Sequence, residues 1–336
     1  MKSSHFARAL WFGILGALFF AFTFIFNRSM NLAGGSWMWS ASLRYLFSLP
    51  MMAVLVWQKG ELKGVLSAIA RAPWTWLLWS TVGFGLFYAP LSMASIYGES
   101  WFVAATWQIT ILAGLLLTPL FGQKIPKKQL GMTLLILLGI VLIQIPYFGR
   151  DLGEGVVRAS ILILIAAFSY PLGNRKMLVH CKEEQLSTTQ RVFGMTLMSV
   201  PFWLLLSVFA GVDAGFPSSG QMLQSLIVAV FSGVIATMLF FEATNLVKHN
   251  HRQLAVVEAT QAGEVLFTLF GGCLFLGDQI PTPLGFLGVF IVIVGIVGNS
   301  LLTSSEKTVV KKLNLKYDIA VRYTHENTRK GVFFLE

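Results

Sequence analysis

FGQKIPKKQLGMTLLILLGIVLI at residues 121–143 and LGDQIPTPLGFLGVFIVIVGIVG at residues 276–298 are two versions of one phrase. Each has glycine as its second residue and an Ile-Pro pair three residues later, and each continues as an apolar stretch long enough to cross a bilayer as a helix. The first version carries Lys124, Lys127 and Lys128, whereas the second carries Asp278 and no base. Basic residues favour the cytoplasmic side, so the two versions are predicted to face opposite sides of a membrane.

Further matches at a slowly growing spacing indicate that the whole chain arose by one duplication. A polar phrase, Asn-Arg-x-Met, closes an apolar stretch in each copy and is predicted to end a helix there, where its Asn and Arg can cap exposed carbonyls. An arginine also recurs in the second apolar stretch of each copy. The matching pairs are residues 27–30 and 174–177, Arg44 and Arg191, and ATWQ at 105–108 and ATQ at 259–261.

Composition excludes a soluble globular domain, because 55% of the 336 residues are hydrophobic and only 12% are charged, against about 25% charged residues in an average soluble domain. The apolar stretches predict an all-α polytopic membrane protein with ten transmembrane helices. The predicted spans are residues 9–27, 38–57, 73–97, 101–121, 129–147, 156–174, 187–210, 221–246, 253–276 and 281–302.

Each copy of the repeat holds five spans, an odd number, so the second copy must enter the membrane inverted. The predicted units are residues 1–148, residues 149–303 and a polar, basic cytoplasmic tail at 304–336. With both termini in the cytoplasm, most of the 25 Lys and Arg residues fall inside. The net charge of +10 then reflects topology and contact with anionic lipid, and needs no nucleic acid.

Ten spans in two halves, an arginine in the second span of each half and the two quoted phrases resemble the drug/metabolite transporter superfamily with its EamA-like repeats. Residues 19–50, FFAFTFIFNRSMNLAGGSWMWSASLRYLFSLP, are similar to a bacterial branch of multidrug resistance efflux transporters. The resemblance implies antiport of drugs or metabolites. Four-helix relatives exchange protons for cationic drugs on a glutamate of their first helix, but no acid lies between Trp11 and Asn27 here. That glutamate's role therefore has no counterpart in this first span.

Acidic residues inside a membrane are costly and tend to line a cavity. Glu258, Gln261 and Glu264 fall on one face of the ninth predicted span, and Thr268 extends that face. Glu264 is the deepest of these acids, so it is predicted to couple transport to protons, with Glu258 as an entry or relay group. Glu242 lies nearer the cytoplasmic end of the eighth predicted span. It either forms a salt bridge at the membrane interface or takes part in gating.

The first half offers uncharged groups at the related depth. Gln108 and Trp107 lie in the fourth span and Tyr88 in the third, and these aromatic rings either stack on a planar or cationic substrate or pack between helices. Arg44 and Arg191 either anchor helix ends or take part in gating or substrate contact.

The function expected from these features is a proton-coupled secondary transporter that exports small organic solutes by alternating access. A metabolite or amino-acid exporter and a membrane sensor or assembly protein stay open as alternatives. The expected partners are a small-molecule substrate, protons and the lipid bilayer of the cell membrane, and a homodimer is left open. Enzymatic activity, a cofactor and a metal site are not expected. No nucleophile and base recur at one depth, no phosphate-binding loop is present, and the KHNH sequence at 248–251 lacks a third ligand.

Overall fold

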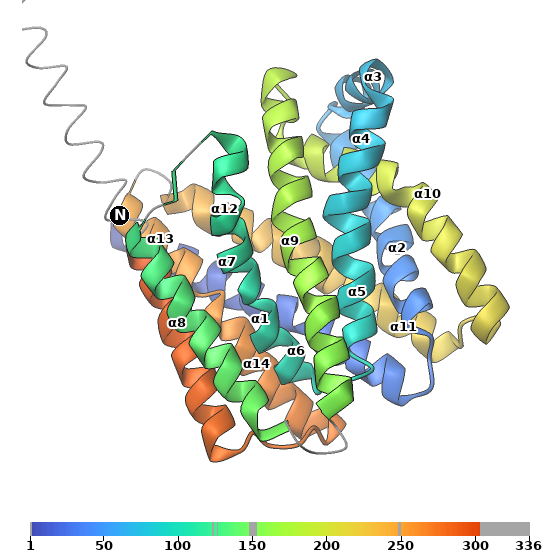
Figure 1. The fold of residues 1–336 in the computed structure, drawn as a ribbon. Helices are drawn as coiled ribbons and strands as arrows, with labels where there is room; N and C mark the ends of the chain where they lie inside the picture. The colour runs from blue at the N-terminus through green and yellow to red at the C-terminus, as the bar shows by residue number, and fades with distance from the viewer. Residues whose placement is uncertain (1, 123, 126, 148–152, 248–249, 303–336) are drawn as a thin grey trace, which may run out of the picture.

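A computed structural model describes residues 2–122, 124–125, 127–147, 153–247 and 250–302. Nine helices in these ranges are long and apolar enough to cross a membrane, and the shorter apolar helix Ser100–Leu116 makes a tenth segment. All ten coincide with predicted spans, and no strand occurs among the described residues. The protein is therefore a polytopic all-α membrane protein (Figure 1). The predicted tail at 304–336 lies outside the described residues.

The helices of the first half are α1 (Lys2–Leu32), α2 (Trp37–Gln58), α3 (Leu62–Arg71), α4 (Pro73–Ser80), η1 (Thr81–Gly85), α5 (Leu86–Ala94), α6 (Ser100–Trp107), α7 (Ile109–Leu116), η2 (Thr118–Phe121) and α8 (Lys127–Gln144), followed by η3 (Ile145–Tyr147). Those of the second half are α9 (Gly153–Glu183), α10 (Thr188–Ala214), α11 (Ser219–Ile227), η4 (Val228–Ala236), α12 (Thr237–Val247), α13 (His251–Ala259), α14 (Ala262–Gly271) and η5 (Gly272–Leu276). A terminal helix, Pro283–Leu302, follows.

The prediction that Asn-Arg-x-Met ends a helix holds in the first copy, where α1 ends at Leu32, and is wrong in the second, where α9 continues to Glu183. The asparagines of this phrase do not bind the carbonyls of a helix end in either copy. Asn27 is buried and accepts a hydrogen bond from the hydroxyl of Tyr88 at 3.2 Å. Asn174 donates to the carbonyl of Tyr170 one turn earlier in its own helix, at 2.9 Å.

Two kinds of irregularity fall at matching places in the two halves. The third membrane segment of each half contains a π-helical stretch, η1 in the first half and η4 in the second. The fourth segment of each half is interrupted, between α6 and α7 at Gln108 and between α13 and α14 at Thr260–Gln261. The interruptions fall on the matching ATWQ and ATQ sequences. Both π turns and tightened turns within a helix are often found at functional sites.

The first helix of each half packs within the other half. α1 lies against α12, η4 and α14, and α9 lies against α5, η1 and α7. Figure 1 shows α9 beside α5 and α7. The contact between α9 and η1 depends on two glycines, because a Cβ atom built on Gly173 meets the backbone of Gly83 well inside normal contact distance.

Candidate functional site

The interruption in the first half explains the role of Gln108. Its backbone N–H donates to the carbonyl of Ala105 at 3.2 Å, which is the tighter pattern of a 3₁₀ turn. This leaves the carbonyl of Ala104 without the donor that a regular helix would supply. The side-chain amide of Gln108 donates to that carbonyl at 3.2 Å. Gln108 is buried and stabilises the interruption itself.

The interruption in the second half separates residues that were predicted to share one continuous helical face. Glu258 belongs to α13, Gln261 lies in the interruption, and Glu264 is in the first turn of α14. The side-chain nitrogen of Gln261 is buried and has no hydrogen-bond partner among the described residues. Thr268 is also buried, but its hydroxyl donates to the carbonyl of Glu264 at 2.7 Å and so is satisfied within its own helix. The face therefore presents Gln261 and Glu264, without the hydroxyl of Thr268.

The contact between α1 and α14 sets the depth of Glu264. A Cβ atom built on Gly263 meets Ala17 at 3.6 Å, and one built on Gly271 meets Ile25. Glu264, which follows Gly263, therefore lies at the Ala17 end of this contact. Glu264 is half-buried, and Arg44 acts electrostatically on its carboxylate.

Arg44 lies where helices of both halves meet. Its Nη1 donates to Oγ1 of Thr23 and its Nη2 to Oγ of Ser232, both at 3.3 Å. These two hydroxyls are themselves joined at 2.6 Å, which links α1 to η4. The guanidinium carbon lies 4.1 Å from the centre of the Tyr88 ring, within the range of a cation–π contact. Tyr88 is fully buried, and its ring supports Arg44.

Tyr170 on α9 marks the place where the charged groups converge. Its phenol lies within electrostatic range of Arg191, Glu264 and Arg44. The Nε of Arg191 is buried and has no hydrogen-bond partner among the described residues. Two guanidinium groups and one carboxylate therefore act electrostatically on a single aromatic side chain. We call Arg44, Arg191, Glu264, Gln261 and Tyr170 the central cluster.

Aromatic side chains form one wall beside the central cluster. The ring of Phe87 lies 4.8 Å from that of Tyr170 and 5.1 Å from that of Trp107, measured between ring centres. Trp107 is 5.8 Å from Tyr170 in an edge-to-face arrangement. Since 39% of Tyr170 is exposed, this wall offers an aromatic surface beside the two arginines.

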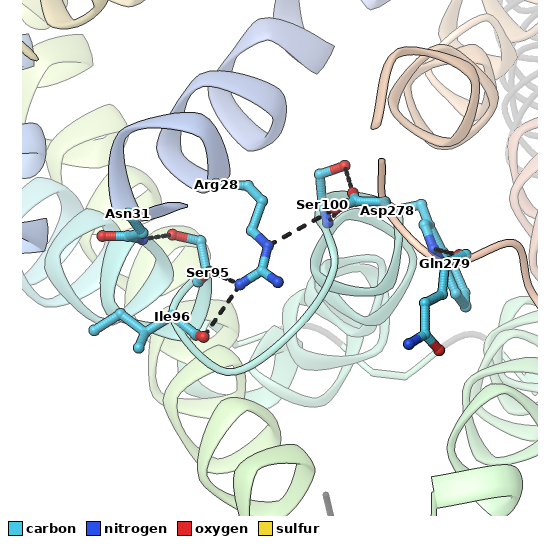
Figure 2. Close-up of polar contacts among 8 residues, drawn as sticks. Arg28, Asn31, Ser95, Ile96, Ser100, Asp278 and Gln279 are labelled. Atoms are coloured by element: carbon cyan, nitrogen blue, oxygen red, sulfur yellow. Dashed lines mark hydrogen bonds and ion pairs between the residues drawn. The ribbon is translucent and has the colours of Figure 1, made fainter. Parts of the chain in front are cut away.

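A second polar group ties the two halves together at one end of the molecule (Figure 2). The Nη1 of Arg28 donates to the carbonyls of Ser95 and Ile96 at 3.1 and 3.2 Å, just beyond the end of α5. Its Nε lies 3.8 Å from Oδ1 of Asp278. The other oxygen of Asp278 accepts hydrogen bonds from the backbone N–H and hydroxyl of Ser100, at 2.8 and 2.5 Å. Asp278 thus caps the N-terminus of α6 from the far half of the sequence.

A small cavity of about 240 Å³ lies beside this contact and is lined by Arg28, Tyr97, Glu99 and Gln279 among others. Burial raises the pKa of Glu99, with Asp278 acting in the same direction and Arg28 opposing it. The equivalent of Arg28 in the second copy, Arg175, has different surroundings. It donates to the carbonyl of Gly114 at 2.6 Å and lies 5.9 Å from the centre of the Phe121 ring.

The remaining predicted residues are not brought into the central cluster. Glu242 is exposed on α12. Glu258 is half-buried on α13, before the interruption. No group of three or more metal-ligating side chains occurs among the described residues.

Sequence reasoning missed Thr23, Ser232 and Tyr170. A signal for two of them was present, because Thr23 and Tyr170 both stand four residues before the asparagine of the repeated Asn-Arg-x-Met phrase. Each also belongs to the surroundings of the repeated arginine, Thr23 by a hydrogen bond to Arg44 and Tyr170 by electrostatic contact with Arg191.

Interrupted membrane helices with charged and aromatic groups beside the interruptions are typical of membrane transporters. The sequence model of one such family, EmrE, described as "Putative multidrug resistance efflux transporter", matches residues 7–305. The chain belongs to this family. It is 46% identical to the uncharacterized protein YjlA of Bacillus subtilis (strain 168), over 89% of this chain and 96% of that protein. It is 42% identical to an uncharacterized 42.1 kDa protein of Shouchella clausii, encoded in the 3′ region of an intracellular alkaline protease, over 76% of this chain and 70% of that protein.

Proposed function

We propose that the protein is a proton-coupled secondary transporter that exports small organic solutes across the cell membrane. Its two five-helix units, residues 1–148 and 149–303, are inverted relative to each other, and both termini are cytoplasmic. The solute binds at the central cluster, and the two units expose that cluster to one side of the membrane and then to the other. Glu264 takes up and releases the coupling proton, and Glu258 on α13 passes protons between Glu264 and water.

The interrupted helix at Thr260–Gln261 is the observation that carries this proposal. Interrupted helices in the two copies of an inverted repeat commonly form the substrate site of secondary transporters. Here the interruption is followed within one turn by Glu264, which Arg44 reaches electrostatically. Glu264 therefore combines a titratable group, a place next to a helix interruption and contact with Arg44 of the first half.

The contacts between halves also support alternating access. The hydroxyl pair of Thr23 and Ser232 joins α1 to η4, and the Arg28–Asp278 contact joins α1 to the loop after η5. Contacts of this kind can separate without unfolding a helix. In the proposed cycle the Arg28 contact closes one entrance while solute reaches the central cluster from the other.

Substrate-dependent proton movement in liposomes tests the proposal. Purified protein would be reconstituted with a pH-sensitive dye inside, and small amines, carboxylates and zwitterions added one by one. At least one class is expected to move protons and to accumulate against its gradient when a pH difference is imposed. In Glu264→Gln the imposed pH difference should no longer drive accumulation, whereas Glu242→Gln, at an exposed position outside the cluster, should behave as the wild type. Normal coupled transport by Glu264→Gln would reassign the proton to Glu258 or Glu242.

The family's description favours drugs as solutes, and the aromatic wall of Phe87, Trp107 and Tyr170 fits planar molecules. Metabolite export is the second candidate. It is favoured by the two arginines, because a site built only for cationic drugs has no use for guanidinium groups beside its acid.

A further inference from the structure

We infer that the solute of the central cluster carries a carboxylate or a similar anionic group, and that Arg44 binds this group. The inference rests on the transport function proposed above and names the chemical class of its substrate.

The charge of the central cluster is the first argument. Arginine stays charged under all physiological conditions, and a charge within a membrane requires a partner. Three ion pairs join described residues, Arg28–Asp278, Arg71–Glu184 and Arg158–Glu154, and none of them includes Arg44 or Arg191. Glu264 is the acid that acts on Tyr170 together with both arginines. One carboxylate among two guanidinium groups leaves the cluster with an excess of positive charge.

The hydrogen bonds of Arg44 are the second argument. A guanidinium group has five N–H donors, and those of Arg44 reach two hydroxyl acceptors among the described residues, Thr23 and Ser232, each at a long 3.3 Å. Together with the Tyr88 ring, these hydroxyls hold the plane of the guanidinium in place. The side chain is only half-buried. A carboxylate is the acceptor whose two oxygens fit the remaining donors of such a fork.

Buried donors without an acceptor are the third argument. The buried amide nitrogen of Gln261 and the buried Nε of Arg191 both lack an acceptor among the described residues. A buried donor without an acceptor is destabilising. An anionic solute would supply acceptors, whereas an ammonium group would bring further donors into a cluster that already has too many. The aromatic wall beside Tyr170 would receive the apolar part of the same solute.

Three probes with one apolar group and different charges test this assignment: 3-phenylpropionate, 3-phenylpropanamide and 3-phenylpropylamine. Each would be titrated against the purified full-length protein in lipid nanodiscs, with the melting temperature as the readout. We expect 3-phenylpropionate to raise the melting temperature in a saturable way, and the amide and amine to have little effect. A preference for the amine, or no response to the carboxylate, overturns the inference.

Variants assign the effect to Arg44. Arg44→Gln should weaken binding of 3-phenylpropionate by about 10- to 100-fold, the size expected for a charge-assisted hydrogen-bonded contact. Arg44→Lys should restore part of it. Arg158→Gln is the control. It removes an exposed arginine near the N-terminus of α9, outside the central cluster, and should leave the affinity unchanged. If Arg44→Gln does not fold, Ser232→Ala removes one support of the guanidinium and should weaken carboxylate binding several-fold. Undiminished binding in both variants contradicts the assignment.

The outcome is distinguishable from a failure of the transport proposal. Carboxylate binding that depends on Arg44 but produces no flux in liposomes would leave this inference standing and remove the transporter. Proton-coupled flux of amines without carboxylate binding would do the reverse.

Discussion

Arg28 on α1 and Asp278 in the loop after η5 form an ion pair, with 3.8 Å between Nε and Oδ1, that connects the first helix of the chain to the segment before its last. The side chain of Asp278 is only 2% exposed, and 20% of Arg28 is. Asp278 simultaneously caps α6 through Ser100. Asp278, a residue of the second half, thus binds two helices of the first half, α1 and α6.

Removing either partner of this pair should destabilise the folded protein, and the two effects should not add. Arg28→Gln leaves Asp278 buried without its cation, and Asp278→Asn weakens both the ion pair and the cap of α6. The double variant should lose less than the sum of the single variants, with a coupling free energy of about 0.5–3 kcal/mol. Thermal unfolding of the four proteins in micelles measures this. Strictly additive losses would show that the pair does not contribute as a unit.

Glu99 should make stability depend on pH. Burial raises the pKa of its carboxyl, so above the usual carboxyl range the folded protein still holds a proton that the unfolded chain has released. Rising pH through this range therefore lowers the free energy of unfolding. Glu99→Gln removes this part of the pH dependence, which melting temperatures measured from mild acid to neutral pH would reveal. Glu183→Gln, an exposed control at the end of α9, should keep the wild-type slope, and an unchanged slope in Glu99→Gln would contradict the prediction.

The close approach of α8 and the terminal helix should tolerate no side chain at Gly139. A Cβ atom there would lie 2.7 Å from the carbonyl oxygen of Gly288 and 2.9 Å from the nitrogen of Val292. Gly139→Ala should therefore destabilise the protein by about 1–3 kcal/mol, because the two backbones must move apart. Gly131→Ala on the same helix meets nothing within 4 Å and should be neutral or slightly stabilising. Equal unfolding temperatures for the two variants would argue against this packing.

Topology reporters test the inverted arrangement directly. A reporter fused after Lys128 should report the cytoplasm, and one fused after Gln279 should report the opposite side, because the two positions lie in matching phrases of the two copies but precede helices of opposite direction. An alkaline phosphatase and green fluorescent protein pair gives complementary signals at each position. The same side for both fusions would refute the inverted repeat.

The membrane segments were predictable from sequence because the thickness of the bilayer fixes the length of each apolar stretch. Helix ends were less so. Arg28 and Arg175 look like residues of a helix end, but their partners lie on neighbouring helices, the carbonyls of Ser95 and Gly114 among them. A sequence does not reveal such partners.

The candidate site was predictable only in part. Glu264 could be selected from its expected depth alone, and Arg44 acts electrostatically on it in the folded chain. The interruptions of the helices were not predictable, because glutamine and threonine are ordinary residues within helices. At Gln108 the side-chain amide donates to the carbonyl of Ala104 in place of the backbone N–H. This replacement of one hydrogen bond by another is visible only in the folded chain.

The different surroundings of Arg28 and Arg175 have a consequence for the energy landscape of the protein. The same duplicated arginine meets a buried carboxylate at one end of the molecule, and a carbonyl and an aromatic ring at the other. In a transporter built from matching halves, unequal closures give the two end states unequal free energies. The empty protein would then rest mostly in the conformation closed at the Arg28 end, so that one membrane face is the default side of entry.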